Sequence, residues 1–313
     1  ENVAIGYRAG KSITTGVNNT IIGGGAGDVM TTGGRNTILG YRAVGVGDLT
    51  GFDNVVIGEV AGNDLTSGQG NVIIGQGAGA QMTGGDWNVL IGQQAGDAIT
   101  SAQKNVAVGF NALSAEDDGD NNVAVGYAAL QTLNAGADAG NVAVGHQAGL
   151  DMTTGIKNSI LGAFAGENLT SGSENVAIGT YALGTENAHG KNVAIGSLAL
   201  YAQDAGADAY NTAVGWEAGS SISTGVHNTL LGAKAGDALT SGGYNVAIGF
   251  DALSTEDAHG KNTAIGFEAL KVLNVGSDGH NTVVGYQAGL AATTGTDNVF
   301  MGHQAAKAVT TGA

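Results

Sequence analysis

Residues 2–6 read NVAIG, and residues 262–266 read NTAIG. This Asn-x-x-x-Gly motif occurs eighteen times in the 313 residues, and alanine stands seven positions after the asparagine in every copy, from Ala9 to Ala305. The asparagines are Asn2, Asn19, Asn36, Asn54, Asn71, Asn88, Asn105, Asn122, Asn141, Asn158, Asn175, Asn192, Asn211, Asn228, Asn245, Asn262, Asn281 and Asn298. Counted along the sequence, thirteen of the seventeen spacings equal 17, three equal 19 and one equals 18. Such regularity predicts a chain of stacked repeats.

A second period groups the repeats in fours. The three longest spacings follow Asn122, Asn192 and Asn262, which lie 70 residues apart, and the first group of four follows the same plan with one residue fewer. We treat residues 1–313 as a single repetitive segment. Its super-repeats cover approximately residues 2–70, 71–140, 141–210, 211–280 and 281–313, of which the last is partial.

Each repeat is predicted to form one coil of a solenoid. The three residues after the asparagine are rich in β-branched and other apolar types, which indicates a short strand. The second half of most repeats carries an apolar residue followed by Thr-Thr-Gly or Thr-Ser-Gly, as at 13–16 and 239–242, where glycine suits a turn with positive φ. A unit of this length is too short for two helices but can hold two short strands and two turns. We therefore expect an all-β fold, a parallel β-solenoid of 18 coils.

Two invariant columns have structural explanations. Stacked asparagine side chains can hydrogen-bond to one another along the solenoid as a ladder, which we prefer to a catalytic or glycosylated asparagine. The alanine column indicates a position where only a methyl group fits.

The strand pattern predicts an assembly. Side chains alternate between the two faces of a strand, yet the second and third residues after the asparagine are apolar in every repeat. We expect the third residue to face the core and the second to be covered by identical chains. The larger residues of this expected interchain apolar face are Ile21, Ile38, Val56, Ile73, Leu90, Ile160, Leu230, Val283 and Phe300.

Composition excludes several classes of partner. The formal net charge is −16, which argues against nucleic acids and anionic membranes, because both need a basic surface. The sequence contains no apolar run long enough to predict a transmembrane helix. The chain has no cysteine, so disulfides and cysteine metal sites are absent. Because it begins and ends inside a repeat, we expect it to be a segment of a longer protein.

The motif at 2–6 and 262–266 resembles the NxAIGxxA repeat of trimeric autotransporter adhesin heads, and similar repeats occur in bacteriophage tail fibres. The resemblance covers the whole chain. It implies a left-handed parallel β-roll in which three chains share one axis. Adhesin heads commonly have shorter coils, and no stalk, neck, membrane anchor or fibre chaperone is recognisable in this sequence. The long coils and the four-coil super-repeat are more like those of tail fibres.

No catalytic or cofactor site is expected. The six histidines, which occupy differing coil positions without metal-ligand spacing, are His146, His189, His227, His259, His280 and His303. Residues 116–120 cluster carboxylates in one turn, with weaker relatives at Glu186 and at 256–257. Oxygen-rich loops can hold Ca²⁺, but the spacing is not that of an EF-hand, and a solvated acidic turn is the preferred interpretation. We expect a non-enzyme without metal or cofactor.

One aromatic column is the candidate binding site. The residue after the anchor glycine is aromatic in eight repeats: Tyr7, Tyr41, Phe110, Tyr127, Trp216, Phe250, Phe267 and Tyr286. Such a column could stack sugar rings of a host-surface glycan. The alternative, that the rings pack between chains, is favoured because Phe has no polar group.

The sequence thus predicts an extracellular, homotrimeric structural shaft or receptor-reaching segment of a tail fibre that serves in host attachment. The alternative is the head of a bacterial trimeric adhesin at the cell surface. An ice-binding solenoid fits less well, because the threonine column is interrupted in the repeats that begin at Asn175 and Asn192.

Overall fold

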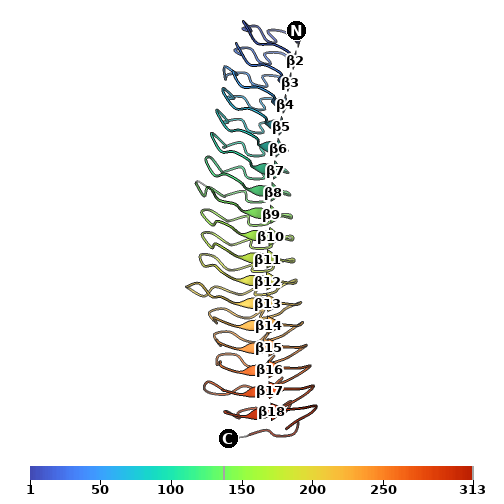
Figure 1. Ribbon diagram of the computed structural model, residues 1–313, viewed down its shortest axis with the longest axis vertical. Coiled ribbons are helices and arrows are strands. Elements are labelled where there is room, and N and C mark those ends of the chain that lie inside the picture. The colour runs from blue at the N-terminus through green and yellow to red at the C-terminus, as the bar shows by residue number, and fades with distance from the viewer. Residues whose placement is uncertain (137, 312–313) are drawn as a thin grey trace. The chain divides into compact units, whose positions relative to one another are not determined.

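The computed structural model describes residues 1–136 and 138–311. It contains two compact units, Glu1–Lys157 and Asn158–Ala313, each of which is a β-solenoid (Figure 1). Among the described residues of the first unit there are nine strands: β1 (Val3–Ile5), β2 (Thr20–Ile22), β3 (Thr37–Leu39), β4 (Val55–Ile57), β5 (Val72–Ile74), β6 (Val89–Ile91), β7 (Val106–Val108), β8 (Val123–Val125) and β9 (Val142–Val144). The described part of the second unit also has nine: β10 (Ser159–Leu161), β11 (Val176–Ile178), β12 (Val193–Ile195), β13 (Thr212–Val214), β14 (Thr229–Leu231), β15 (Val246–Ile248), β16 (Thr263–Ile265), β17 (Thr282–Val284) and β18 (Val299–Met301).

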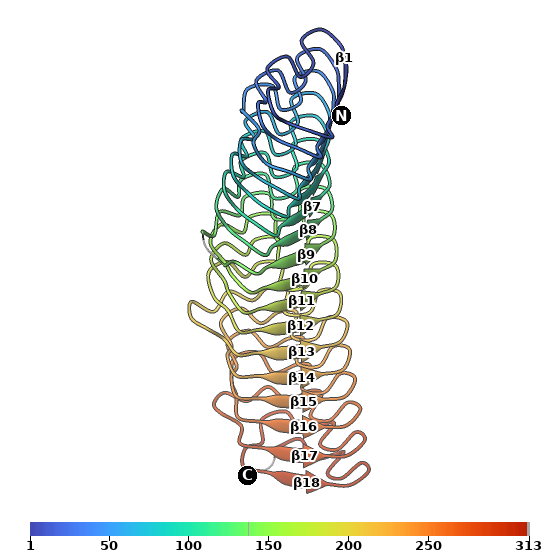
Figure 2. The ribbon, with the colours of Figure 1, turned by 45° about the horizontal axis from the view of Figure 1, so that its top comes forward.

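Within each unit the strands are parallel and pair in chain order, and equivalent residues of successive coils are in register. Val72, for example, pairs with Val89, one repeat later. Figure 2 shows successive strands lying side by side while the turns loop away from them. The predicted fold class, a parallel β-solenoid with one coil per sequence repeat, is confirmed.

The second half of the coil differs from the prediction of a second strand. Apart from one isolated bridge between Gly34 and Phe52, turns and bends fill this half in the part of the chain described. It is still hydrogen-bonded from coil to coil: the Thr14 amide donates to the Thr31 carbonyl at 3.0 Å. These bonds satisfy the backbone of the turns without a regular strand.

Two glycine positions recur among the repeats for steric reasons. The anchor Gly23 has φ +137°, and a Cβ there would lie 2.3 Å from the Gly40 carbonyl oxygen of the next coil. We had predicted that positive φ requires glycine at the turn position of Gly16. Gly16 does not have a positive φ, so this reason is wrong. A Cβ on Gly16 would lie 2.5 Å from the Gly33 oxygen. Close approach of successive coils, rather than turn conformation, therefore requires glycine there.

The predicted asparagine ladder is present, and it also closes each coil. The Asn36 Oδ1 accepts hydrogen bonds from the Asn54 backbone amide and Nδ2, both at 3.0 Å. The Asn54 Nδ2 also donates to the Gly68 carbonyl, at the far end of its own coil, at 2.8 Å. Asn54 is completely buried. One side chain thus joins the start of a coil to its end and to the preceding coil, which explains why no other residue type occurs there.

The core explains both the alanine column and the variation of the second strand residue. Ala148 and its equivalents from Ala26 to Ala288 are fully buried. The second strand residue also points inward, and in most coils its size varies inversely with that of the residue after the column alanine. Ala143 and Ala213 are exceptions, because each is paired with a glycine. Leu230 faces Gly236, whereas Ala247 is accompanied by the buried Leu253. In most coils this compensation keeps the core filled. Beside Gly219 the core is filled by Leu200 and Leu230 of the neighbouring coils.

This geometry corrects the predicted interchain face. Ile21, Ile38, Val56, Ile73, Leu90, Ile160, Leu230 and Val283 are at most 1% exposed within the single chain, and Phe300 in the last coil is half-buried. These residues form the core and are not available to a partner. We had assigned the wrong face of the strand to the core. The second strand residue faces inward, and the first and third strand residues face outward.

Candidate functional site

The outward strand face is apolar in both units. Its third-position side chains are Ile, Leu or Val in every strand except β18, which has Met301. Leu39 is 41% exposed, Leu161 49% and Leu231 47%. The first strand residue beside them is Val, Thr or Ser. Each unit therefore presents a continuous strip of apolar side chains to its surroundings.

The aromatic column forms stacks within the chain. In the first unit Phe110 stacks on Tyr127 with ring centroids 5.4 Å apart, and Tyr127 stacks on His146 at 5.1 Å. In the second unit the four residues from successive coils, Phe250, Phe267, Tyr286 and His303, stack at 5.3 to 5.5 Å. Inside a stack both faces of a ring are covered by neighbouring rings. Packing between coils of one chain thus covers the faces of these rings, while Phe110, Tyr127, Phe250, Phe267 and Tyr286 remain exposed in part. Packing of these rings between chains stays a prediction.

A second stack lies just before the anchor asparagines and was missed by the sequence analysis. His227 lies between Tyr210 and Tyr244, with centroid distances of 5.4 and 4.9 Å. All three residues adopt positive φ, between 52° and 60°. Their shared position, directly before the anchor, was the available signal.

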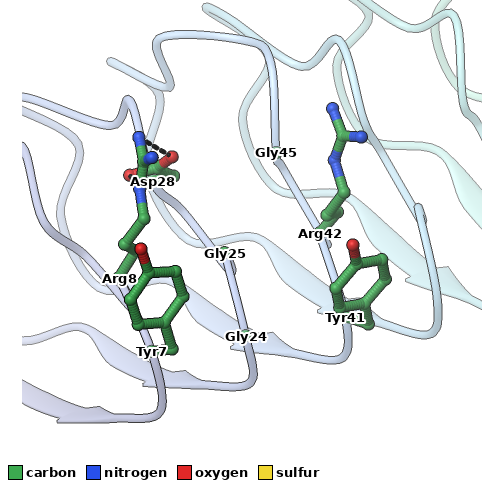
Figure 3. A pocket seen from close by; sticks show the side chains of 8 residues that line it. All are labelled: Tyr7, Arg8, Gly24, Gly25, Asp28, Tyr41, Arg42 and Gly45. Carbon is green, nitrogen blue, oxygen red and sulfur yellow. Dashed lines mark hydrogen bonds and ion pairs between the residues drawn. The ribbon is translucent and has the colours of Figure 1, made fainter.

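One opening in the column lies between Tyr7 and Tyr41. The intervening coil carries Gly24 and Gly25, so the two tyrosines flank a hollow of about 320 Å³ without a ring between them (Figure 3). Two coil steps separate the tyrosines by roughly 10 Å, which leaves room for one ring stacked against both. Arg8, whose guanidinium pairs with Asp28 at 2.7 Å, lines the same hollow.

Arg42 lines the other end of this hollow, and in the described part of the chain it makes no ion pair. Its guanidinium lies above Tyr41 in Figure 3. The hollow thus combines two exposed aromatic faces with hydrogen-bond donors, which is the chemistry that binds a sugar ring.

Trp216, another exposed residue of the aromatic column, has one face of its ring covered. The Lys234 ammonium lies 5.2 Å from the centre of its ring and 3.6 Å from the Glu217 carboxylate. Lys234 therefore covers one face of the Trp216 ring and pairs with the carboxylate of the adjacent Glu217. This makes the Tyr7–Tyr41 hollow the better glycan candidate.

The acidic turn at 116–120 does not form one cation site. Glu116 is fully buried, and its Oε1 accepts the Gly119 amide at 2.8 Å. Asp118 instead accepts the Ser101 hydroxyl at 2.6 Å, and Asp120 accepts the Gln103 amide at 2.6 Å. Because these carboxylates bind different partners, the turn does not gather them around a single ion.

Three buried glutamates occupy one inward-facing position, eleven places after the anchor asparagine. Most coils have Leu, Ile or Met there, but three have Glu116, Glu186 and Glu256, which are fully buried and recur at the same place in three successive super-repeats. Burial raises the pKa of all three carboxyls, and it raises that of Glu186 to about 7. Burial therefore disfavours the charged form of these carboxyls relative to the same group in water.

Histidines stand beside two of these glutamates. His189 Nδ1 is 3.5 Å from Glu186 Oε1, and His259 Nδ1 is 3.5 Å from Glu256 Oε1. Ligand atoms of Glu186, His189 and Asp204 lie within 4.8 Å of one another, as do those of Glu256, His259 and Asp257. We had predicted that the histidines occupy differing coil positions, and this pair was not foreseen. Its signal is a Glu-x-x-His motif at the same place in two successive super-repeats.

Comparisons with family models, curated proteins and solved structures found no match to the chain. Over the described residues, no helix is both long and apolar enough to span a membrane. The geometry therefore carries the functional argument.

Proposed function

We propose that the chain is a structural segment of a homotrimeric bacteriophage tail fibre that reaches toward the host surface. The observation that carries this proposal is the outward apolar strand face. A soluble monomer rarely exposes a contiguous apolar patch larger than a few hundred Å². An identical chain is the occupant that matches this strip, because its own strip has the same repeat spacing and the same apolar residues.

The size of the strip supports a stable assembly. Three residues span roughly 10 Å and nine strands span roughly 40 Å, so each unit offers roughly 400 Å². Two units offer roughly 800 Å² per chain, so three chains would together bury roughly 2,400 Å² of strip, shared among three interfaces. The number three and the tail-fibre assignment come from the resemblance of the NxAIGxxA motif. The alternative, an adhesin head, shares both the repeat and the expected trimer, and a virion-attachment or membrane-anchor domain in the flanking sequence would distinguish them.

The assembly proposal is tested with charges placed on the strip. The double variant Leu161→Asp/Leu231→Asp puts two carboxylates on the outward face, where they do not disturb the core. We expect it to sediment as a monomer in analytical ultracentrifugation while the parent chain remains assembled. Ser221→Asp, an exposed turn residue outside the strip, is the matched control. Equal sedimentation of the double variant and the parent would exclude the strip as the interface.

Glycan binding is a second candidate function, favoured by the hollow between Tyr7 and Tyr41. Repetition would supply avidity if several chains present the same hollow. On a glycan array, Tyr41→Ala should lose binding without loss of assembly, whereas Phe267→Ala, in the middle of a covered stack, should keep it. Binding that survives Tyr41→Ala, or no binding by the parent, would place receptor recognition outside this hollow.

A further inference from the structure

The three buried glutamates use their oxygens differently. In each, Oε1 accepts the backbone amide of the residue three positions later, at 2.8 to 3.2 Å. Oε2 of Glu116 accepts the Ala135 amide, and Oε2 of Glu256 accepts the Val275 amide, both at 3.2 Å. These two glutamates thus cap the longer coil that follows. Glu186 differs, because its Oε2 is buried without a hydrogen-bond partner.

Two more groups lie beside the Glu186 carboxyl. The buried Nδ1 of His189 also lacks a hydrogen-bond partner. Asp204, exposed on the following coil, brings its carboxylate within 4.8 Å of both ligand atoms. The equivalent of Asp204 is Asn274 in one related super-repeat and Asn134 in the other. A buried carboxylate oxygen and a buried imidazole nitrogen without partners are costly, and both belong to side chains that gather with the exposed Asp204 carboxylate.

We propose that Glu186, His189 and Asp204 bind one divalent transition-metal cation of the Zn²⁺ class. Ligands at tetrahedral angles and roughly 2.0–2.1 Å from Zn²⁺ lie roughly 3.4 Å from one another. The 3.5 Å between Glu186 Oε1 and His189 Nδ1 already matches this spacing. Imidazole favours Zn²⁺, Cu²⁺ or Ni²⁺ over the hard cations Ca²⁺ and Mg²⁺. Solvent reaches the site from the Asp204 side and completes the coordination.

The cation would join two successive coils. Glu186 and His189 belong to the coil that begins at Asn175, and Asp204 belongs to the coil that begins at Asn192. Binding displaces the proton of the Glu186 carboxyl, so affinity falls as the pH is lowered. Because the folded coils hold all three ligands together, bound metal raises the melting temperature. The related cluster of Glu256 and His259 is weaker, because both Glu256 oxygens already accept backbone amides.

The test is a titration of the full chain with ZnCl₂ by isothermal calorimetry, in a His259→Gln background that removes the weaker cluster. We expect one Zn²⁺ per chain. Adding His189→Gln should abolish this binding, since even loss of an outer-shell partner costs about 10–100-fold in affinity. His227→Gln in the same background is the matched control, because the His227 ring stacks between tyrosines, and it should bind like its parent.

Absence of saturable Zn²⁺ binding in the His259→Gln chain would overturn the proposal, as would binding that survives His189→Gln. Asp204→Asn provides a second variant, because this exposed residue can be changed without disturbing the core. It should weaken Zn²⁺ binding by at least about tenfold and leave the metal-free melting temperature unchanged. Unchanged affinity in Asp204→Asn would contradict the three-ligand site.

Discussion

Adjacent leucines of β14 provide a matched pair that tests which strand face is the core. Leu230 is fully buried and Leu231 is 47% exposed. A Cβ added to Gly219 would lie 2.7 Å from a Leu230 methyl, and one added to Gly236 would lie 2.9 Å from the other. Backbone therefore encloses the Leu230 side chain, and the surroundings cannot collapse around a smaller residue. Leu230→Ala should cost about 3–5 kcal/mol, the upper part of the range for buried leucines.

Leu231→Ala should cost less than about 1.5 kcal/mol in the separated chain, because roughly half of its side chain is already in water. The assay is hydrogen exchange of the peptide covering residues 228–245, since each coil contacts only its neighbours and local stability is the relevant quantity. Leu230→Ala should accelerate exchange by more than about a hundredfold. Leu231→Ala should change it by about tenfold or less. Equal acceleration by the two variants would refute the assigned orientation of the strand.

Three further predictions follow from the same core. Gly236→Leu should partly rescue Leu230→Ala, because the pair then matches the Ala247 and Leu253 arrangement of the next coil; a double variant no more stable than Leu230→Ala in a thermal melt would contradict size compensation. Ala148→Leu should cost about 1–3 kcal/mol through overpacking, and a circular-dichroism melt identical to that of the parent would show a loosely packed column. Glu186 has a pKa raised from 4.5 to about 7, so its contribution to stability is fully present below pH 4.5 and is lost as the pH rises through 7. In EDTA, the free energy of unfolding of Glu186→Gln should fall less with rising pH than that of the parent, by on the order of 3 kcal/mol. A denaturation profile of Glu186→Gln that keeps the parent's pH dependence would contradict this prediction.

Periodicity alone predicted most of the fold. Anchors such as Asn54 and Gly23 recur because each touches its equivalent in the next coil, so one repeat contained the information for all. The orientation of the strand could not be deduced in the same way. With both faces of such a short strand apolar, alternation does not say which face is inside. The inverse sizes of positions such as 230 and 236 contained that information, because only residues that share a core compensate in volume.

The candidate sites were predictable only in part. The aromatic column was evident, but whether a ring face is open depends on the neighbouring coil, as Gly24 beside Tyr7 and Lys234 beside Trp216 show. The cluster around Glu186 was hidden, because Asp204 lies on a different coil and the unused oxygen is a feature of three-dimensional packing. Glu116 and Glu186 share a position in the repeat, yet only the structure distinguishes their hydrogen bonds.

The measurement that tests the central claim most directly is the solution mass of the unmodified chain by light scattering at micromolar concentration. If the outward strand strips of identical chains pack together as proposed, the mass should be about three times the 30.7 kDa of one chain. A stable, monodisperse species of 30.7 kDa would contradict the proposed assembly, because the apolar strips would then remain exposed to water.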